Sequence, residues 1–143
     1  MKYCFLAVDD EPLALQDLTN ALHTAEPEAQ VHDFTYPEEA LAAVRAGTLS
    51  PQVAFLDIQM RGWTGLALAV ELRKLLPALE VIFVTAYSQY ALESYSLHAR
   101  GYLMKPVTPE DIAEELRNIG LTTVRTAQEK ALRVQCFGNF EAF

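Results

Sequence analysis

Polar side chains that could carry out chemistry stand at the ends of four short apolar runs. They are two acids after the first run, and then single residues at the ends of three later runs: Asp9, Asp10, Asp57, Thr85 and Lys105. Three carboxylates suit Mg²⁺, which takes oxygen ligands and leaves positions open for phosphate oxygens. A hydroxyl and an ammonium beside them would hold further oxygens of a phosphoryl group. The set therefore predicts phosphoryl transfer, with Asp57 as the nucleophile that forms an aspartyl phosphate.

The apolar runs predict the strands that must bring these residues together. They cover 3–8, 53–57, 81–85 and 101–104, and a weaker alternating run covers 30–34. Helices are predicted between them at about 12–25, 37–46, 64–76, 88–97 and 109–119, where apolar residues recur at helical spacing. Regular alternation of strands and helices with short connections predicts an α/β fold, a doubly wound sheet of five parallel strands with helices on both faces. The strand ends then share one edge, where ligands bind in such sheets.

Length and composition favour a single globular domain and argue against a nucleic-acid-binding or membrane-spanning protein. The 143 residues suffice for one domain with a good core, and half of them are apolar. A formal net charge of −8 argues against direct nucleic-acid binding by this chain. The sequence has no signal peptide and no run long enough to cross a membrane. Cys4 and Cys136 lie too far apart for a disulfide framework or a metal knuckle, so reduced thiols and a cytoplasmic location are expected.

The polar strand ends resemble the motifs of a known family. In order and spacing the matching segments are Val8-Asp9-Asp10-Glu11-Pro12, Asp57-Ile58-Gln59-Met60, Thr85-Ala86 and Lys105-Pro106. Together they resemble the receiver domain of response regulators in two-component signalling, and the resemblance covers residues 1 to about 120. It implies a flavodoxin-like sheet with strand order 2-1-3-4-5.

The resemblance also implies a role for each matching residue. Asp57 would accept a phosphoryl group from a sensor histidine kinase, and Lys105 would pair with Asp57 or its phosphate. Asp10 would bind Mg²⁺ directly and Asp9 mainly through water, and the main-chain carbonyl of Gln59 would complete the protein ligands. Such a domain is not an enzyme acting on separate substrates; it catalyses its own phosphotransfer and dephosphorylation.

Activation is expected to change one face of the domain. The resemblance implies that Thr85 moves toward the phosphoryl group and that Tyr102, the switch aromatic, swings inward. The fourth helix, fifth strand and fifth helix would then form the face of a homodimer.

Two positions depart from the family pattern. Arg61-Gly62 stands where the family usually has Pro after the Met of the acceptor loop, which makes the loop less rigid and adds charge near the site. Trp63 replaces a smaller apolar residue. Gln59 and Tyr87 lie where receivers tune the lifetime of the phosphate. Neither departure removes a catalytic group, so altered kinetics are expected.

The last part of the chain has a different composition. Residues 121–131 are polar and predict a linker, and residues 132–143 alternate apolar and polar as a half-buried strand would. Val134 to Glu141 resemble the opening strand of the winged-helix output domain in regulators similar to the antibiotic regulatory proteins of actinomycetes. This predicts transcriptional output, with DNA bound only through a domain largely absent from the chain. An ordinary C-terminal tail is the alternative.

Two other functions remain open from the sequence. One is a phosphorylation-independent receiver that acts as a protein-interaction module, although such modules usually lose a member of the set Asp10, Asp57, Thr85 and Lys105. The other is an unrelated Mg²⁺-dependent phosphatase, which would need a second acid beside the nucleophile where this sequence has Gln59.

Overall fold

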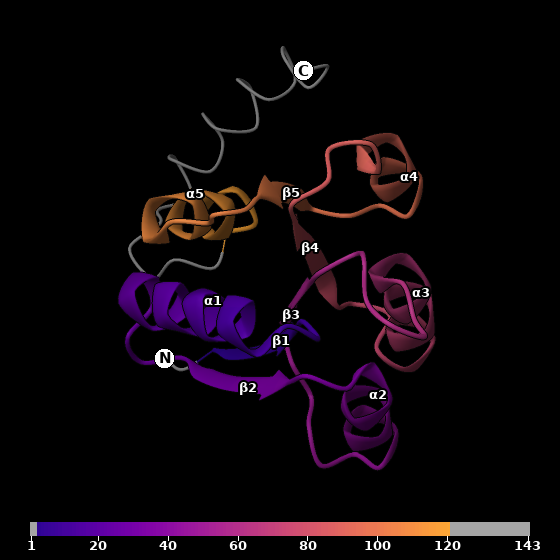
Figure 1. Ribbon diagram of the computed structural model, residues 1–143. Helices are drawn as coiled ribbons and strands as arrows, with labels where there is room; N and C mark the ends of the chain where they lie inside the picture. The colour runs from indigo at the N-terminus through magenta and orange to yellow at the C-terminus, as the bar shows by residue number, and fades with distance from the viewer. Residues whose placement is uncertain (1–2, 121–143) are drawn as a thin grey trace.

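Five parallel strands form the middle layer of the structure, a computed structural model that describes residues 3–120 (Figure 1). The strands are β1 (Cys4–Val8), β2 (Gln30–Phe34), β3 (Val53–Leu56), β4 (Glu80–Thr85) and β5 (Gly101–Met104). Their order in the sheet is β2-β1-β3-β4-β5, and every neighbouring pair is parallel. This confirms the predicted doubly wound α/β fold with the flavodoxin-like strand order.

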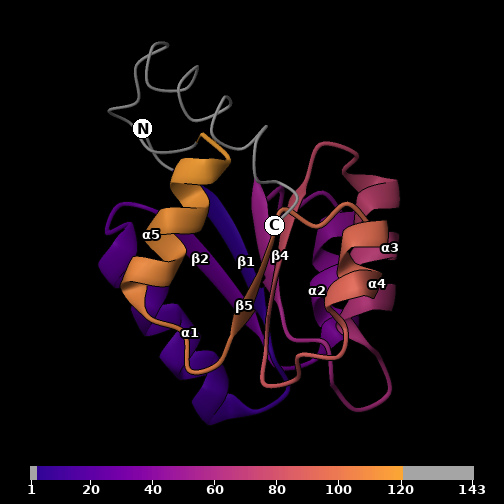
Figure 2. The same cartoon turned by 90° about the horizontal axis from the view of Figure 1, so that it is seen from above.

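Helices cover both faces of this sheet. They are α1 (Pro12–Ala25), α2 (Pro37–Arg45), α3 (Gly65–Leu75), α4 (Ala91–Ser96) and α5 (Pro109–Asn118). Figure 2 shows α1 and α5 on one side of the strands and α2, α3 and α4 on the other. Three of the helices begin with a proline in the first turn, where the missing N–H costs nothing. Thr108 and Asp111 add a capping box to α5.

The core lies in two layers because successive side chains of the central strands point to opposite faces. Phe5 and Phe55 point toward α1 and α5, and their rings meet edge to face with centroids 5.5 Å apart. Leu6 and Leu56 point the other way, into the layer under α2 and α3. All four side chains are fully buried. Packing on both faces fixes the register of β1 and β3, and this register decides which residues meet at the carboxyl edge.

One helix is shorter than the sequence predicts. The pattern indicates a helix over 88–97, whereas α4 spans Ala91–Ser96. The hydroxyls of Ser94 and Ser96 donate to the carbonyls of Ala91 and Glu93 within the helix. Such bonds compete with regular helix hydrogen bonding, which shortens a helix that is already rich in Ser and Tyr.

The C-terminal predictions concern residues that the structure does not describe. The linker at 121–131, the strand at 132–143 and Cys136 all lie outside residues 3–120. Among the described helices, none combines the length and the apolar character that crossing a bilayer requires.

Candidate functional site

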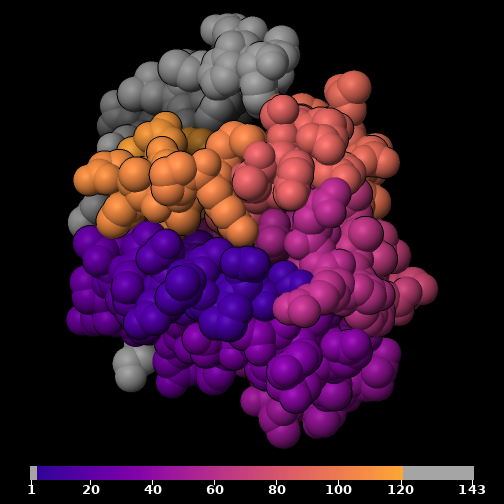
Figure 3. Space-filling view, in the orientation of Figure 1, coloured from indigo at the N-terminus to yellow at the C-terminus, as the bar shows by residue number. Residues whose placement is uncertain are grey.

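The carboxyl ends of four strands bring the predicted polar residues to one edge of the sheet. Asp9 and Asp10 follow β1, and Asp57 follows β3; the Asp57 N–H donates to the Val8 carbonyl at 3.0 Å. Thr85 is the last residue of β4, and its carbonyl accepts the N–H of Lys105 at 2.9 Å. These ladder bonds place each functional residue beside the next, as the strand-end reasoning predicted. The same edge faces the viewer in Figure 3, where indigo residues of the β1–α1 connection are flanked by orange and magenta segments.

Three carboxylates form a tight cluster at this edge. Asp9, Asp10 and Asp57 each offer an oxygen, and these oxygens all lie within 4.8 Å of one another. Asp9 and Asp57 are buried, whereas Asp10 is partly exposed. Closely spaced hard oxygens, with one side open to solvent, fit the chemistry of a Mg²⁺ site.

Lys105 supplies the positive charge inside the cluster. Its Nζ lies 2.7 Å from Asp9 Oδ2 and 3.3 Å from Asp57 Oδ2. The resemblance implied a partnership with Asp57, but Asp9 is the nearer partner. Burial lowers the pKa of Lys105, but the hydrogen bond and charge of Asp9, followed by those of Asp57, outweigh burial and raise the pKa above its ordinary value. The ammonium therefore stays charged throughout the neutral range.

Asp57 is held in a setting that resists its ionisation. Burial and then the charge of Asp9 raise the pKa of Asp57, and Lys105 and a hydrogen bond from Thr85 offset this only in part. One carboxylate oxygen, Oδ1, accepts the N–H of Ile58 at 2.8 Å. Asp57 Oδ2 faces Lys105, so the two oxygens have distinct partners. Added positive charge at this site would favour the carboxylate form that acts as a nucleophile.

Thr85 and Tyr102 are connected through Tyr87, which lies in the loop between β4 and α4. The Thr85 side chain is fully buried, and its Oγ1 accepts the N–H of Tyr87 at 3.3 Å. The hydroxyl of Tyr102 in turn donates to the carbonyl of Tyr87. Burial raises the pKa of Tyr102, so this hydroxyl keeps its proton and remains a donor. The two predicted switch residues thus both hydrogen-bond the main chain of Tyr87.

Gln59 lies in the loop between β3 and α3, and its side chain contacts Tyr90. The side-chain amide donates to the hydroxyl of Tyr90, the residue that precedes α4. A bridge between Gln59 and Thr64 closes this loop, and the N–H of Gly65 donates to the Ile58 carbonyl at 2.8 Å. Tyr90 was not among the predicted site residues, because nothing in its sequence position indicates a partner 31 residues away.

An open cleft of about 700 Å³ lies above the carboxylates. Its lining combines the predicted residues Asp10, Asp57, Gln59 and Lys105 with Arg61 and Tyr87 from the surrounding loops. Arg61 contacts Asp10 with both its main-chain N–H and its guanidinium. The sequence indicated extra charge near the site at Arg61 but not the partner of that charge.

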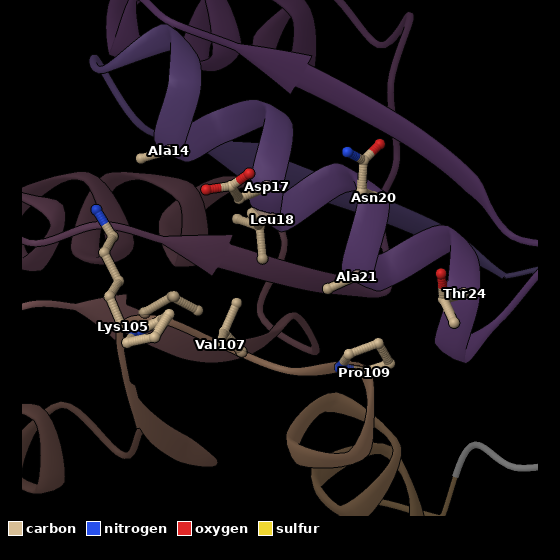
Figure 4. Close-up of a pocket in the computed structure, with 11 residues that line it drawn as sticks. Ala14, Asp17, Leu18, Asn20, Ala21, Thr24, Lys105, Val107 and Pro109 are labelled. Carbon is tan, nitrogen blue, oxygen red and sulfur yellow. The ribbon is translucent and has the colours of Figure 1, made fainter.

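A second hollow, of about 560 Å³, lies between α1 and the segment that joins β5 to α5. Figure 4 shows Leu18 and Ala21 of α1 on one side and Val107 and Pro109 on the other. Lys105 lines both this groove and the cleft above the carboxylates. The groove is mostly apolar and holds no cluster of reactive groups among the described residues.

Comparisons with known proteins agree with this geometry. The sequence profile of the response regulator receiver domain matches residues 5–117. The chain is 42% identical over 120 residues to the positive alginate biosynthesis regulatory protein of Pseudomonas aeruginosa, covering 78% of this chain and 45% of the relative. It is 33% identical over 112 residues to the sensory transduction protein LytT of Bacillus subtilis, covering 78% and 46%. The chain therefore spans about half the length of these curated relatives.

A solved structure extends the likeness to three dimensions. The response regulator protein TrrA of Thermotoga maritima, solved in complex with Mg²⁺–BeF, superimposes with a TM-score of 0.66 at 30% identity, covering 82% of this chain and 97% of that chain. The family profile spans most of the chain, and the polar residues of the family's motifs meet at one edge of the expected fold. This chain belongs to the response regulator receiver domain family.

Proposed function

We propose that this chain is a phosphorylation-activated receiver whose phosphoacceptor is Asp57. The observation that carries the proposal is the meeting of Asp57 with two further carboxylates, an ammonium and a buried hydroxyl at one edge of the sheet. No other cluster of three or more metal-ligating residues occurs among residues 3–120. The arrangement supplies positioning and charge, which phosphoryl transfer needs more than it needs further covalent catalysis.

In the proposed reaction a carboxylate oxygen of Asp57 attacks the phosphorus of a phosphohistidine on a sensor kinase. A P–O bond forms as the P–N bond breaks, and the electron pair returns to the imidazole, which takes up a proton. Lys105, at 3.3 Å from Asp57, would hold one oxygen of the transferred group. Thr85 would donate its hydroxyl to another oxygen. The same site would later hydrolyse the acyl phosphate, which resets the receiver.

The carboxylates would hold the metal that the reaction needs. Asp10 and Asp57 would bind Mg²⁺ directly and Asp9 through water, with the main-chain carbonyl of Gln59 as the remaining protein ligand. Bound Mg²⁺ would neutralise negative charge on the phosphoryl oxygens. Support comes from the separation of the acidic oxygens, all within 4.8 Å, and from the similar receiver TrrA, which was solved with Mg²⁺–BeF.

Phosphorylation would then be read at the surface formed by α4, β5 and α5. Thr85 and Tyr102 form the proposed two-state element, because both hold the Tyr87 segment. The surface carries large apolar side chains that are open to solvent, with exposed fractions of 81% for Leu92, 52% for Tyr95 and 43% for Met104. Apolar side chains gathered in this way suit a homodimer face.

We further propose that residues 1–120 are the receiver, 121–131 the linker and 132–143 the beginning of an output domain that controls transcription. The similar alginate protein is named as a regulator of biosynthesis, and the chain covers 45% of its length. DNA would be bound through that output domain, in keeping with the net charge of −8 on this chain.

The test is the covalent adduct itself. The protein is incubated with acetyl phosphate, with and without MgCl₂, and its intact mass is recorded beside Asp57→Asn and a control, Asp33→Asn, which changes an exposed acid of β2. One phosphoryl group is expected on the wild type and on the control only with MgCl₂, and none on Asp57→Asn. Absence of the adduct, while a known receiver is labelled in parallel, would favour the phosphorylation-independent interaction module. Turnover of a simple phosphate ester would favour the phosphatase.

A further inference from the structure

Arg61 places a second cation at the acidic cluster, on an acid that Lys105 does not contact. Its main-chain N–H donates to Asp10 Oδ2 at 2.9 Å, and its guanidinium Nε approaches the same oxygen at 3.4 Å. The two buried acids, Asp9 and Asp57, share Lys105. Asp10 is the remaining acid of the cluster, and Arg61 is the cation that it contacts. Every carboxylate of the cluster therefore has a cation from the protein itself.

The two cations differ in how firmly they are held. The side chain of Lys105 is 23% exposed and contacts acids that are almost fully buried, so removing it from them would leave buried charges unpaired. The side chain of Arg61 is 90% exposed, and Asp10 is 16% exposed. An ion pair so open to water contributes little to stability and breaks at little cost.

There is also room for the guanidinium to leave. Asp10 and Arg61 line the acceptor cleft, and they also line a neighbouring hollow of about 440 Å³. That second hollow is bordered by Tyr36 and by Glu38, an exposed acid in the first turn of α2. A guanidinium displaced from Asp10 would remain solvated and close to a negative charge.

We propose that Arg61 is a displaceable counter-ion of Asp10 that competes with Mg²⁺ and so lowers the affinity of this receiver for the metal. The inference rests on the proposed metal site, and it concerns a residue where the family usually has a proline that carries no charge. In the metal-free protein Arg61 neutralises Asp10; Mg²⁺ takes over that oxygen and the guanidinium moves to solvent. Half-occupancy of the site then requires a higher Mg²⁺ concentration than in a receiver without this cation.

The experiment measures Mg²⁺ binding directly, without phosphorylation. MgCl₂ is titrated into the uniformly ¹⁵N-labelled protein, and shifts are followed at the amide of Ile58 and at the indole N–H of Trp63, the single tryptophan of the sequence. Arg61→Gln removes the guanidinium and keeps the main-chain donor. Arg45→Gln is the matched control, because it removes an exposed arginine at the end of α2, whereas the site lies beyond the start of that helix.

Arg61→Gln is expected to bind Mg²⁺ about two- to five-fold more tightly than the wild type, which is the range that exposed ion pairs contribute. Arg45→Gln is expected to match the wild type. The gain should shrink in 0.5 M NaCl, because salt screens exposed charges. Equal or weaker binding by Arg61→Gln would overturn the inference while leaving the metal site intact. If MgCl₂ shifts no resonance in either protein, the proposed metal site itself is wrong, and the inference falls with it.

Discussion

Glu115 gives the sharpest prediction about how stability depends on pH. This residue of α5 packs its carboxylate against the backbone of β5, so closely that a Cβ added to Gly101 would lie 2.4 Å from Glu115 Oε1. Burial, followed by the charge of Glu114, raises the pKa of Glu115 from 4.5 to about 7; Arg100 lowers it and Asp111 raises it. Between about pH 4.5 and 7 the folded protein therefore keeps a proton here that the unfolded chain has largely lost.

The sign and size of the effect follow from proton linkage. Because the folded-state pKa is the higher one, the stabilising contribution is fully present below pH 4.5 and is lost as the pH rises through about 7. The rise in pKa from 4.5 to about 7 corresponds to an upper limit of about 3.4 kcal/mol in the free energy of unfolding, at 1.36 kcal/mol per pKa unit. Glu115 is partly open to solvent, so screening reduces the expected effect to about 1–2 kcal/mol.

The assay is urea denaturation of the wild type, Glu115→Gln and Glu110→Gln at several values between pH 5.5 and 8.5. Glu115→Gln should exceed the wild type in free energy of unfolding by about 1–2 kcal/mol at pH 8.5, and by clearly less at pH 5.5. Glu110 is an exposed acid in the first turn of the same helix, and its change should give no gain that grows with pH. A constant difference between Glu115→Gln and the wild type across this range would refute the reasoning.

Three further predictions concern the proposed acceptor site. Asp57→Asn should raise the free energy of unfolding at pH 8 without Mg²⁺, because burial and Asp9 raise the pKa of Asp57 and so penalise its charged form above that pKa; a less stable variant in calorimetry would contradict this. Gly65→Ala should cost about 1–3 kcal/mol and reduce phosphoryl labelling, since its Cβ would lie 2.0 Å from the Asp57 carbonyl. A Cβ added at Gly62 meets nothing within 4 Å, so Gly62→Ala should cost only the backbone strain of an L residue at φ +78°, about 1–2 kcal/mol, and phosphoryl labelling should be retained.

The sequence predicts that the polar strand ends meet because a parallel sheet leaves few choices for their positions. Once β1 and β3 are neighbours in register, Val8 and Leu56 are partners, and the residues that follow them must be close. Thr85 and Lys105 join them because β4 and β5 continue the same sheet. Apolar runs that end in polar residues and alternate with helices were therefore enough to predict a doubly wound parallel sheet and the meeting of these groups at its edge, whereas the strand order was implied by the family resemblance.

The strand order does not determine which acidic side chain each cation of the site contacts, so these pairs could not be predicted in the same way. Lys105 is near two carboxylates, and only the path of its side chain makes Asp9 the closer partner, at 2.7 Å against 3.3 Å for Asp57. Arg61, in the loop between β3 and α3, contacts Asp10, which lies 51 residues away in the sequence. Loop conformation determines such pairs. When several acids lie within reach of a flexible cation, the sequence does not show which of them it contacts.

The geometry around Tyr87 suggests how the acceptor site and the α4–β5–α5 face communicate in the proposed function. Thr85 Oγ1 accepts the N–H of Tyr87, and Tyr102 donates to the carbonyl of the same residue. If the Thr85 hydroxyl turns toward a phosphoryl group on Asp57, the bond from Tyr87 weakens and its peptide is free to move. The hydroxyl of Tyr102 would then lose the acceptor that holds it. Motion at a fully buried threonine would thus reach a tyrosine near the surface through one residue.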